Sequence, residues 1–410
     1  MPDRQTFVIV GANLCGGRAA ETLRQEAFKG RVVLIGEDPE PPYERPPLSK
    51  EYLRGDSPRE RLFIHPPGFY DEQQIELRLG VRATRLDLQA RAVELAGGES
   101  ISFDRLLLAT GGRERRLSVP GSDLEGIYYL RTLADSERLA QELQPGRRLV
   151  VVGAGFIGGE IASSARAKGL EVTVLEMAPV PLERVLGEEM GRLYSQFPRE
   201  HGVELLTGEA IARFEGSGRV ERAVGASGRA IDCDLAVAGV GIDPATELAE
   251  EAGLACENGV VADECCETSV EGVFAAGDVA RFYHPVLGER LRVEHWANAQ
   301  NQGVAAAKNM LGRREPYEEL PWFWSDQYDL KLQYVGHATA WDRVVVRGDV
   351  AGRSFSAFYL QDGRLRATLT VNRFKDIRPS RELIKQGAPV DARKLQDEAV
   401  ELKTLAPQTA

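Results

Sequence analysis

Residues 150–160, VVVGAGFIGGE, decide the fold. A run of branched apolar residues, typical of a buried strand, leads into Gly153, Gly155 and Gly158, and helix-forming residues follow. This G-x-G-x-x-G spacing between a strand and a helix is the dinucleotide-binding turn of a Rossmann-type unit. Small residues let the backbone approach a pyrophosphate, which then lies on the unpaired N–H groups at the helix N-terminus.

An imperfect copy of this motif lies near the N-terminus, in VIVGANLCGG at residues 8–17. Gly11 and Gly16 keep the first and last glycine positions, Asn13 takes the middle one, and Cys15 lies within the turn. Asparagine is one of the few other residues that tolerate unusual backbone angles, and its amide is expected to bond a phosphate oxygen or a bridging water. We therefore expect this turn to keep its dinucleotide, but to hold it less tightly than glycine would.

Each turn is followed by a helix and then by a second strand that ends in an acid. The strand at 31–38 ends in Glu37 and Asp38, and the strand at 171–176 ends in Glu176. Such an acid accepts hydrogen bonds from an adenosine ribose. Two copies of the motif, each in its full context, predict an α/β protein with two doubly wound, Rossmann-like dinucleotide-binding domains.

Later segments complete both domains and add a third. A buried strand at 103–112 ends in a small-residue turn, its counterpart lies at 233–244, and Asp278 follows a strand and a glycine within 270–282. Aromatic, strand-like segments begin after 318 and predict a mostly antiparallel sheet with terminal helices. The predicted domains are a discontinuous first domain at 1–115 and 246–318, an inserted second domain at 116–245, and a C-terminal α+β domain at 319–410.

Composition narrows the class of protein. A chain of 410 residues suggests two or three domains, and a net charge of −11 argues against a nucleic-acid partner. No apolar run approaches the roughly 18 to 20 residues that span a bilayer, and the N-terminus lacks the pattern of a signal peptide, so we expect a cytoplasmic protein. None of the five cysteines forms a C-x-x-C and the five histidines are dispersed, so we expect reduced thiols and no protein-bound metal.

The order of these motifs resembles the FAD-dependent, NADH-linked ferredoxin reductases of bacterial oxygenase systems, over essentially the whole chain. The most specific pieces are PYERPPLSKEYL (42–53), YYLRTLAD (128–135), VEHWANAQNQG (293–303) and PWFWSDQY (321–328). The resemblance implies a glutathione-reductase-like arrangement of the two Rossmann-like domains, with FAD in the first domain and NADH as the cosubstrate of the second.

The family pattern also implies which residues contact FAD. The expected set is Gly11, Asn13, Cys15, Gly16, Glu37, Arg45, Lys50, Ala83, Thr110, Gly111, Arg131, Asp278, Trp296 and Trp324. Glu37 matches the ribose ligand, Asp278 the ribityl ligand, Trp296 a flavin-edge position, and Trp324 the aromatic residue that shields the isoalloxazine. Lys50 is expected near the reactive ring, where a cation favours the anionic reduced flavin.

The same pattern implies the NAD-binding residues. They are Gly153, Gly155, Ile157, Gly158, Glu160, Glu176, Arg184, Gly241 and Glu294. Glu160 matches a residue that reaches the cofactor or Lys50, so Lys50 and Glu160 are the expected catalytic residues. Glu176 favours NADH over NADPH, because a carboxylate repels the 2′-phosphate. Glu294 is expected at the nicotinamide carboxamide.

The implied activity is hydride transfer from NADH to FAD, followed by single-electron transfer to a [2Fe–2S] ferredoxin that feeds a cytochrome P450 or a Rieske oxygenase. A disulfide reductase would need redox cysteines beside the flavin, and PPYERPPLSK (41–50) contains no thiol. Two alternatives stay open. One is a flavoprotein like apoptosis-inducing factor, with a redox-sensing or interaction role. The other is a pyridine-nucleotide-disulfide-type oxidoreductase without a redox disulfide. The sequence leaves the particular ferredoxin, the oxygenase and the oligomeric state undefined.

Overall fold

The structure is a computed structural model that describes residues 5–405, and the chain divides into two compact units. Unit 1 consists of Met1–Glu44, Arg59–Arg113 and Ile242–Pro321. Unit 2 consists of Arg45–Pro58, Glu114–Gly241 and Trp322–Ala410. The three domain boundaries expected from the sequence stay a prediction, and each unit is described by itself.

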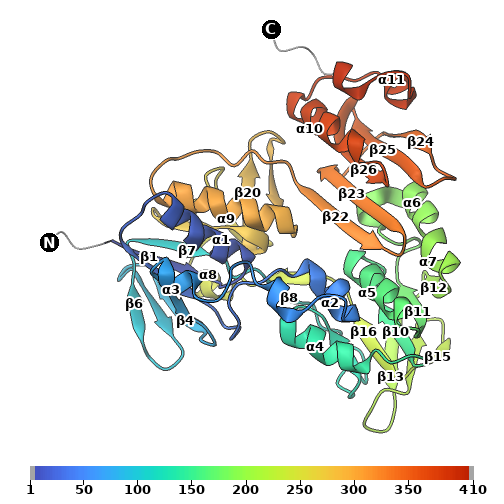
Figure 1. The fold of residues 1–410 in the computed structure, drawn as a ribbon, viewed down its shortest axis with the longest axis horizontal. Helices are drawn as coiled ribbons and strands as arrows, with labels where there is room; N and C mark the ends of the chain where they lie inside the picture. The colour runs from blue at the N-terminus through green and yellow to red at the C-terminus, as the bar shows by residue number, and fades with distance from the viewer. Residues whose placement is uncertain (1–4, 406–410) are drawn as a thin grey trace. The chain divides into compact units, whose positions relative to one another are not determined.

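A five-stranded parallel sheet forms the centre of unit 1, in the order β19-β7-β1-β2-β3. Its strands are β1 (Thr6–Val10), β2 (Arg31–Ile35), β3 (Ile75–Arg78), β7 (Arg105–Leu108) and β19 (Val273–Ala275). Helices α1 (Leu14–Gln25) and α9 (Trp296–Met310) lie side by side against it (Figure 1). A side chain on Gly303 would overlap the backbone of Cys15, so this glycine permits the close approach of the two helices.

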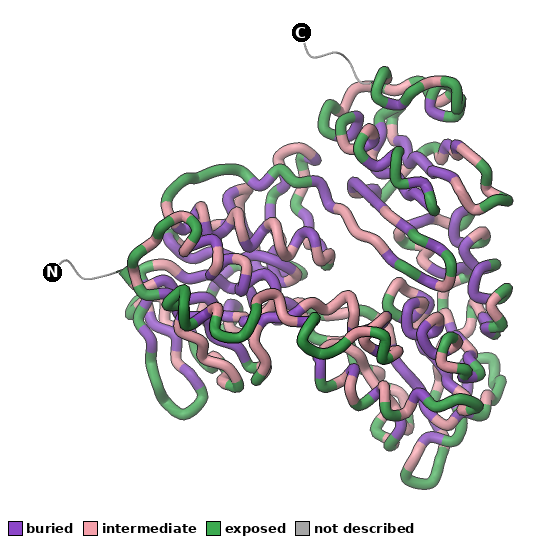
Figure 2. Tube along the Cα trace, viewed as in Figure 1, coloured by how far each residue is buried: buried purple, intermediate pink, exposed green. Residues whose placement is uncertain are grey.

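Strands β1, β2, β7 and β19 of this sheet are buried almost throughout, whereas most of the edge strand β3 is half-buried (Figure 2). Val8 and Val33 are paired across β1 and β2 and are both fully buried. Parallel strands covered on both faces read as continuous apolar runs, which explains why the sequence marked them so clearly.

Two smaller sheets and several short helices complete unit 1. The sheets are β4-β5-β6, which is antiparallel, and β18-β20-β21, which is mixed. Their strands are β4 (Ala83–Asp87), β5 (Ala92–Leu95), β6 (Ser100–Ser102), β18 (Val260–Ala262), β20 (Ala280–His284) and β21 (Glu289–Arg292). The remaining elements are β17 (Ile242–Pro244), α3 (Phe69–Glu72), α8 (Glu247–Glu251), η2 (Arg59–Leu62) and η3 (Gly277–Val279). Strand β8 (Gly112–Glu114) spans the boundary between the units.

Unit 2 repeats the parallel design, in the order β12-β11-β10-β16-β9. Its strands are β9 (Ile127–Tyr129), β10 (Arg148–Val152), β11 (Glu171–Glu176), β12 (Val203–Thr207) and β16 (Leu235–Ala238). The helices around it are η1 (Pro46–Ser49), α2 (Glu51–Arg54), α4 (Leu133–Glu142) and α5 (Phe156–Ala167). A small antiparallel sheet adds β13 (Ile211–Glu215), β14 (Arg222–Gly225) and β15 (Ala230–Asp232).

A second sheet of unit 2 is antiparallel, in the order β22-β23-β26-β25-β24. Its strands are β22 (Trp322–Gln327), β23 (Leu330–Gly336), β24 (Arg343–Asp349), β25 (Ser354–Gln361) and β26 (Arg364–Val371). The helices α6 (Glu183–Tyr194) and α7 (Gln196–Glu200) pack apolar side chains into the core of this sheet. The chain ends in η4 (Phe374–Asp376), α10 (Ile377–Gln386), α11 (Ala392–Gln396) and η5 (Leu402–Thr404).

The two parallel sheets and the later β-rich segment confirm the predicted α/β class. Within residues 5–405, no helix has both the length and the apolar character needed to cross a membrane.

Candidate functional site

The glycine turn of unit 2 leaves space where a ligand would approach. Gly153 has a φ of +101°, and a side chain on Gly153 or Gly158 would overlap a backbone carbonyl. Gly155 is different, because its backbone is extended and an added Cβ would meet no protein atom within 4 Å. Packing of the described chain therefore does not require glycine at 155, whereas a pyrophosphate drawn close to the N-terminus of α5 would. The turn fits a dinucleotide.

Glu176 ends β11 with its carboxylate fixed beside this turn. Its Oε2 accepts a hydrogen bond from the N–H of Ala154 at 2.7 Å, and its Oε1 accepts one from the N–H of Ala178 at 2.9 Å. Each oxygen has a further lone pair for a ribose hydroxyl. The side chain is thus held in one place and is suited to bind an unphosphorylated ribose.

Unit 2 contains three further residues predicted to bind NAD. Ile157, in the first turn of α5, is 47% exposed, which is unusual for a large apolar side chain. Gly241 has a φ of +96°, and Arg184 is exposed on α6. Their part in binding stays a prediction.

The glycine turn of unit 1 has the same close contacts at its first and last glycines. Gly11 has a φ of +121°, and a Cβ there would overlap the carbonyl of Ala109. A Cβ on Gly16 would overlap the carbonyl of Gly11. Both glycines are therefore required by packing as well as being suited to a ligand.

Asn13 has a different role from the one expected. Its backbone is extended (φ −114°, ψ −170°), so no unusual backbone angle needs to be tolerated at this position, and that part of the expectation was wrong. Its side chain is the N-cap of α1: Oδ1 accepts from the N–H of Gly16 at 3.3 Å, and Nδ2 donates to the carbonyl of Ala109 at 2.5 Å. The amide is thus engaged with the protein on both sides.

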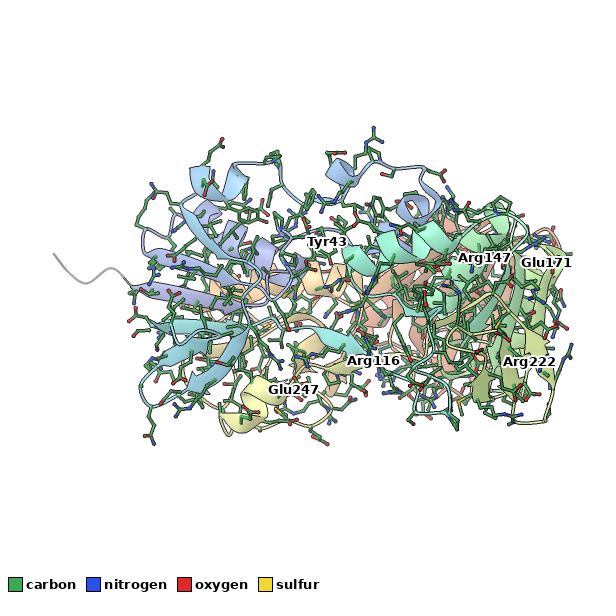
Figure 3. All side chains as sticks on the ribbon, turned by 90° about the horizontal axis from the view of Figure 1, so that it is seen from below. Tyr43, Arg116, Arg147, Glu171, Arg222 and Glu247 are labelled. Atoms are coloured by element: carbon green, nitrogen blue, oxygen red, sulfur yellow. The ribbon has the colours of Figure 1, made fainter. Side chains whose placement is uncertain are left out.

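The acids that follow β2 have separate roles. Asp38 accepts from the Tyr43 hydroxyl at 2.8 Å and from the N–H of Glu40 at 3.1 Å, so it shapes the loop; Tyr43 is labelled in Figure 3. Glu37 is exposed and is the acid that a ribose could reach. Its role as the ribose ligand stays a prediction that this geometry supports.

Four other residues predicted to bind FAD also belong to unit 1. Thr110 donates to the carbonyl of Ala245 at 2.7 Å, and Gly111 has a φ of +70°. Ala83 begins β4, and half-buried Asp278 lies in η3 directly after β19.

Two side chains near the start of α9 are engaged within unit 1. Trp296 donates its indole N–H to Glu44. Burial raises the pKa of Glu44, and the hydrogen bond from Trp296 opposes that shift. Glu294 pairs with Arg292 at 2.7 Å. Their roles at the flavin edge and the nicotinamide carboxamide stay predictions.

Lys50 and Glu160 form a buried ion pair in unit 2. The proline-rich turn η1 carries Lys50 to the start of α2, and Glu160 lies in α5 just after the glycine turn. Lys50 Nζ is 3.4 Å from Glu160 Oε1, and the two residues are only 6% and 4% exposed. The contact that the sequence expected between them is present.

Glu160 has two other hydrogen-bond partners, Ser49 and Ser325, which no sequence motif indicated. Ser49 donates to Glu160 Oε2 at 2.5 Å, and Ser325 donates to Oε1 at 2.7 Å. Burial raises the pKa of Glu160, while Lys50 and the two hydroxyls act in the opposite direction. Ser49 directly precedes Lys50, and Ser325 directly follows Trp324. Their position next to predicted site residues was the only indication in the sequence that they belong to this site.

Three more predicted FAD ligands belong to unit 2. Trp324 lies on β22, where its ring stacks on Trp322 at 5.4 Å and its centroid is 5.5 Å from Lys50 Nζ. Arg45 is the residue before η1, and Arg131 is half-buried just before α4. Trp324 and Lys50 are thus brought together, as a flavin-facing pair would require.

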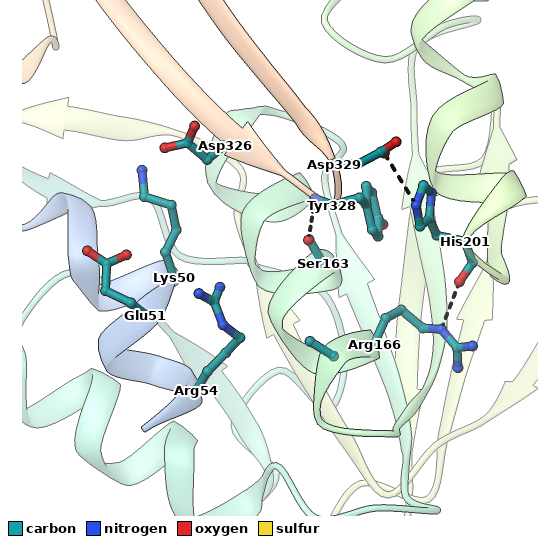
Figure 4. A pocket seen from close by; sticks show the side chains of 10 residues that line it. Lys50, Glu51, Arg54, Ser163, Arg166, His201, Asp326, Tyr328 and Asp329 are labelled. Carbon is teal, nitrogen blue, oxygen red and sulfur yellow. Dashed lines mark hydrogen bonds and ion pairs between the residues drawn. The ribbon is translucent and has the colours of Figure 1, made fainter. Parts of the chain in front are cut away.

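A groove of about 620 Å³ is lined by Lys50 together with other charged side chains (Figure 4). Lys50, Arg54 and Arg166 supply positive charge to its wall, and Glu51, Asp326 and Asp329 supply negative charge. The groove therefore gives Lys50 polar and charged neighbours in addition to its buried contact with Glu160.

All five cysteines are free thiols in the described chain. Burial raises the pKa of Cys15 well above its usual value, and the nearby Cys266 and Asp278 raise it further. Cys15 therefore stays a neutral thiol and acts through its position in the turn. Between residues 5 and 405, no group of three or more His, Cys, Asp or Glu side chains is arranged to hold a metal ion.

Comparison with known proteins identifies the family. The pyridine nucleotide-disulphide oxidoreductase model matches residues 5–303, and the reductase C-terminal model matches residues 322–406. The ferredoxin–NAD(+) reductase component of the anthranilate 1,2-dioxygenase system of Burkholderia cepacia is 41% identical, with 97% of this chain and 98% of that protein covered.

Putidaredoxin reductase of Pseudomonas putida gives a similar result, with 38% identity and coverage of 99% of this chain and 97% of that protein. The crystal structure of the covalent putidaredoxin reductase–putidaredoxin complex matches with a TM-score of 0.96 and 38% identity, over 99% of both chains. These matches extend over all the motifs described above. The chain belongs to the pyridine nucleotide-disulphide oxidoreductase family, among the FAD-dependent, NADH-linked ferredoxin reductases of bacterial oxygenase systems.

Proposed function

We propose that this protein passes electrons from NADH through FAD to a [2Fe–2S] ferredoxin that serves a cytochrome P450 or a Rieske oxygenase. The observation that carries the proposal is the presence of two dinucleotide turns in a chain whose five cysteines, all within the described residues, form no disulfide. Two nucleotides can bind, and no protein disulfide is available to take the electrons. The relatives are named as ferredoxin reductases, which supports a ferredoxin as the acceptor.

The residues of this chain bind and orient the two nucleotides. Gly155 leaves room for the NAD pyrophosphate at the N-terminus of α5, and Glu176 binds the adenosine ribose. In unit 1, Gly11 and Gly16 form the corresponding turn for FAD, and Glu37 binds its ribose. Such binding aligns the reacting groups, which supplies much of the rate enhancement in hydride transfer.

FAD, when bound, supplies the chemistry of accepting a hydride and giving up electrons singly. Lys50 supplies positive charge beside the site, and Glu160 balances that charge in the resting protein. A fixed cation of this kind stabilises negative charge that develops nearby during reaction. Trp324 lies beside Lys50, and we assign it the role of covering the ring and excluding water.

The proposal also assigns a cellular location. NADH as electron donor and five free thiols suit the reducing environment of the cytoplasm.

The test is a panel of purified [2Fe–2S] ferredoxins assayed with NADH and with NADPH. We expect purified protein with bound FAD to reduce cytochrome c rapidly only when a suitable ferredoxin is present, and to prefer NADH. Loss of the cytochrome c signal on omitting the ferredoxin is the control for direct reduction. Failure of every ferredoxin to stimulate the reaction, with FAD fully bound, would contradict the proposal.

A further inference from the structure

A chain of buried hydrogen bonds ends on Glu160 in unit 2. Tyr194 on α6 donates to Gln327 Oε1, and Gln327 Nε2 donates to Ser325 Oγ at 3.0 Å. Ser325 Oγ in turn donates to Glu160 Oε1 at 2.7 Å. Ser325 and Gln327 are 1% and 2% exposed, so water does not compete for these bonds.

The direction of these bonds fixes the Ser325 proton. A serine hydroxyl has a single proton to donate. Because Gln327 already donates to Ser325 Oγ, the proton of that hydroxyl is directed to Glu160. Ser325 therefore stabilises the ionised carboxylate specifically, since a protonated carboxyl would lose part of this interaction.

The local sequence allows this approach. Gly159 is not needed for the G-x-G-x-x-G spacing, but a Cβ there would overlap the amide of Gln327. Gln327 Nε2 also lies 3.5 Å from the carbonyl of Phe156, at the start of α5. Strand β22 and helix α5 are thus shaped to let a side-chain amide pass between them.

We propose that Ser325, oriented by Gln327, is a positioning residue that keeps Glu160 ionised and so balances the charge of Lys50 beside the flavin. The inference rests on the proposed function, because it assigns a consequence to charge at the flavin. Strand β22 carries both Trp324 and Ser325. The same strand therefore supplies the aromatic side chain assigned to cover the flavin ring and the hydroxyl that bonds Glu160.

The expected consequence has a definite sign. Without the Ser325 hydroxyl, Glu160 takes up a proton more readily in its buried position. Lys50 then loses its ion-pair partner but still lines the polar groove. An unbalanced cation stabilises the anionic reduced flavin, so the flavin becomes easier to reduce.

The experiment measures the midpoint potential of bound FAD in the holoenzyme between pH 6 and 9. We expect Ser325→Ala to shift the equilibrium toward the reduced flavin about tenfold at neutral pH, which corresponds to about +30 mV for a two-electron couple. Ser325→Thr, which keeps the hydroxyl, should restore the wild-type potential. Glu160→Gln should give a positive shift at least as large, and Ser325→Ala should add nothing to it in the double variant.

Two further variants make the result decisive. Gln327→Met removes the donor to Ser325 and should shift the potential in the same direction by a smaller amount, which also tests the proposal if Ser325→Ala folds poorly. Ser356→Ala is the matched control, because Ser356 is a buried serine on β25 of the same sheet and donates to Asp376 at 2.8 Å instead of to Glu160. We expect its potential to equal that of the wild type.

The inference is overturned if Ser325→Ala retains FAD but keeps the wild-type potential, shifts it negatively, or adds its shift to that of Glu160→Gln. These outcomes are distinct from a failure of the proposed function. Wild-type protein that binds no FAD, or that reduces no ferredoxin with NADH, would contradict the function whatever the Ser325 variants do.

Discussion

At the scale of single residues, the two glycine turns differ in the residue at the N-cap of the helix that follows. Gly155 caps α5 without a side-chain bond, whereas Asn13 caps α1 and takes the N–H of Gly16 for itself. An N–H that is already bonded within the protein contributes less to a pyrophosphate. In the turn of unit 1, the N–H of Gly16 is therefore used to cap the helix and is less available to a ligand.

Replacing Asn13 with glycine should free that N–H. We expect Asn13→Gly to dissociate from FAD more slowly, with a loss of helix stability of only a few tenths of a kcal/mol from the cap itself. The measurement is FAD release during dialysis, followed by flavin fluorescence, alongside thermal unfolding of the FAD-free protein. Faster release from Asn13→Gly than from the wild type would show that the asparagine supports FAD instead.

Glu176 offers a second residue-scale prediction. In the wild type, both carboxylate oxygens of Glu176 accept a backbone N–H. Glu176→Gln replaces one of these oxygens with an NH2 group, which cannot accept, and removes the negative charge that would repel a 2′-phosphate. We expect the KM for NADH to rise about tenfold and the preference over NADPH to shrink. Steady-state kinetics with both nucleotides and a dye acceptor measure this.

The matched control for Glu176→Gln is Glu171→Gln, at the exposed start of the same strand (Figure 3). It removes the same charge from β11 without touching the glycine turn. Equal effects of the two substitutions would show that net charge, and not the position of Glu176, governs nucleotide choice.

At the scale of elements, Glu142 joins three parts of unit 2. From the end of α4 its carboxylate accepts from Arg147 before β10, from Arg219 before β14 at 2.7 Å, and from Tyr128 on β9 at 2.8 Å. Burial by itself would raise the pKa of Glu142, but these bonds lower it from 4.5 to about 2. A lowered pKa stabilises the fold above pH 4.5, and that stability is lost as the pH falls toward 2.

The Glu142→Gln variant should therefore be less stable than the wild type at pH 7, by roughly 1 kcal/mol, and the difference should shrink as the pH falls from 5 to 2. Thermal unfolding across this pH range measures the effect, and Glu171→Gln again serves as the exposed control. A difference between Glu142→Gln and the wild type that does not change with pH would mean that the hydrogen bonds do not depend on the charge.

The sequence predicted strands and turns wherever their pattern lies within a few neighbouring residues. It did not predict which side chains bond to each other across long stretches of the chain. Strands β1, β10 and β11 and their glycine turns follow from apolar runs and residue spacing within a few positions. The bonds of Ser49 and Ser325 to Glu160 join residues 111 and 165 positions apart, which no local pattern encodes. Arg347 is similar: it lies in a run of valines yet is buried, because it donates to carbonyls of the C-terminal segment such as that of Val400 at 2.7 Å.

At the scale of the whole molecule, the predicted ligands divide unevenly between the units. Unit 2 contains the complete glycine turn and Glu176, to which we assign the adenosine diphosphate half of NADH. The expected FAD ligands lie mainly in unit 1, but Arg45, Lys50, Arg131 and Trp324 belong to unit 2. The binding of the adenosine half of NADH should then depend little on whether FAD is present.

Removal of FAD tests this division. We expect FAD-free protein to bind ADP-ribose, which represents the half of NAD that unit 2 can hold by itself, with an affinity within about tenfold of that of the holoenzyme. Isothermal titration measures both. Gly155→Val should abolish binding to either form, because the valine side chain would fill the space left for the pyrophosphate. A Cβ at this position meets no protein atom within 4 Å, so the substitution should leave the fold intact. If FAD-free wild-type protein does not bind ADP-ribose, the turn of unit 2 needs FAD to take its shape, and the two nucleotide sites are coupled through the fold instead of being built separately.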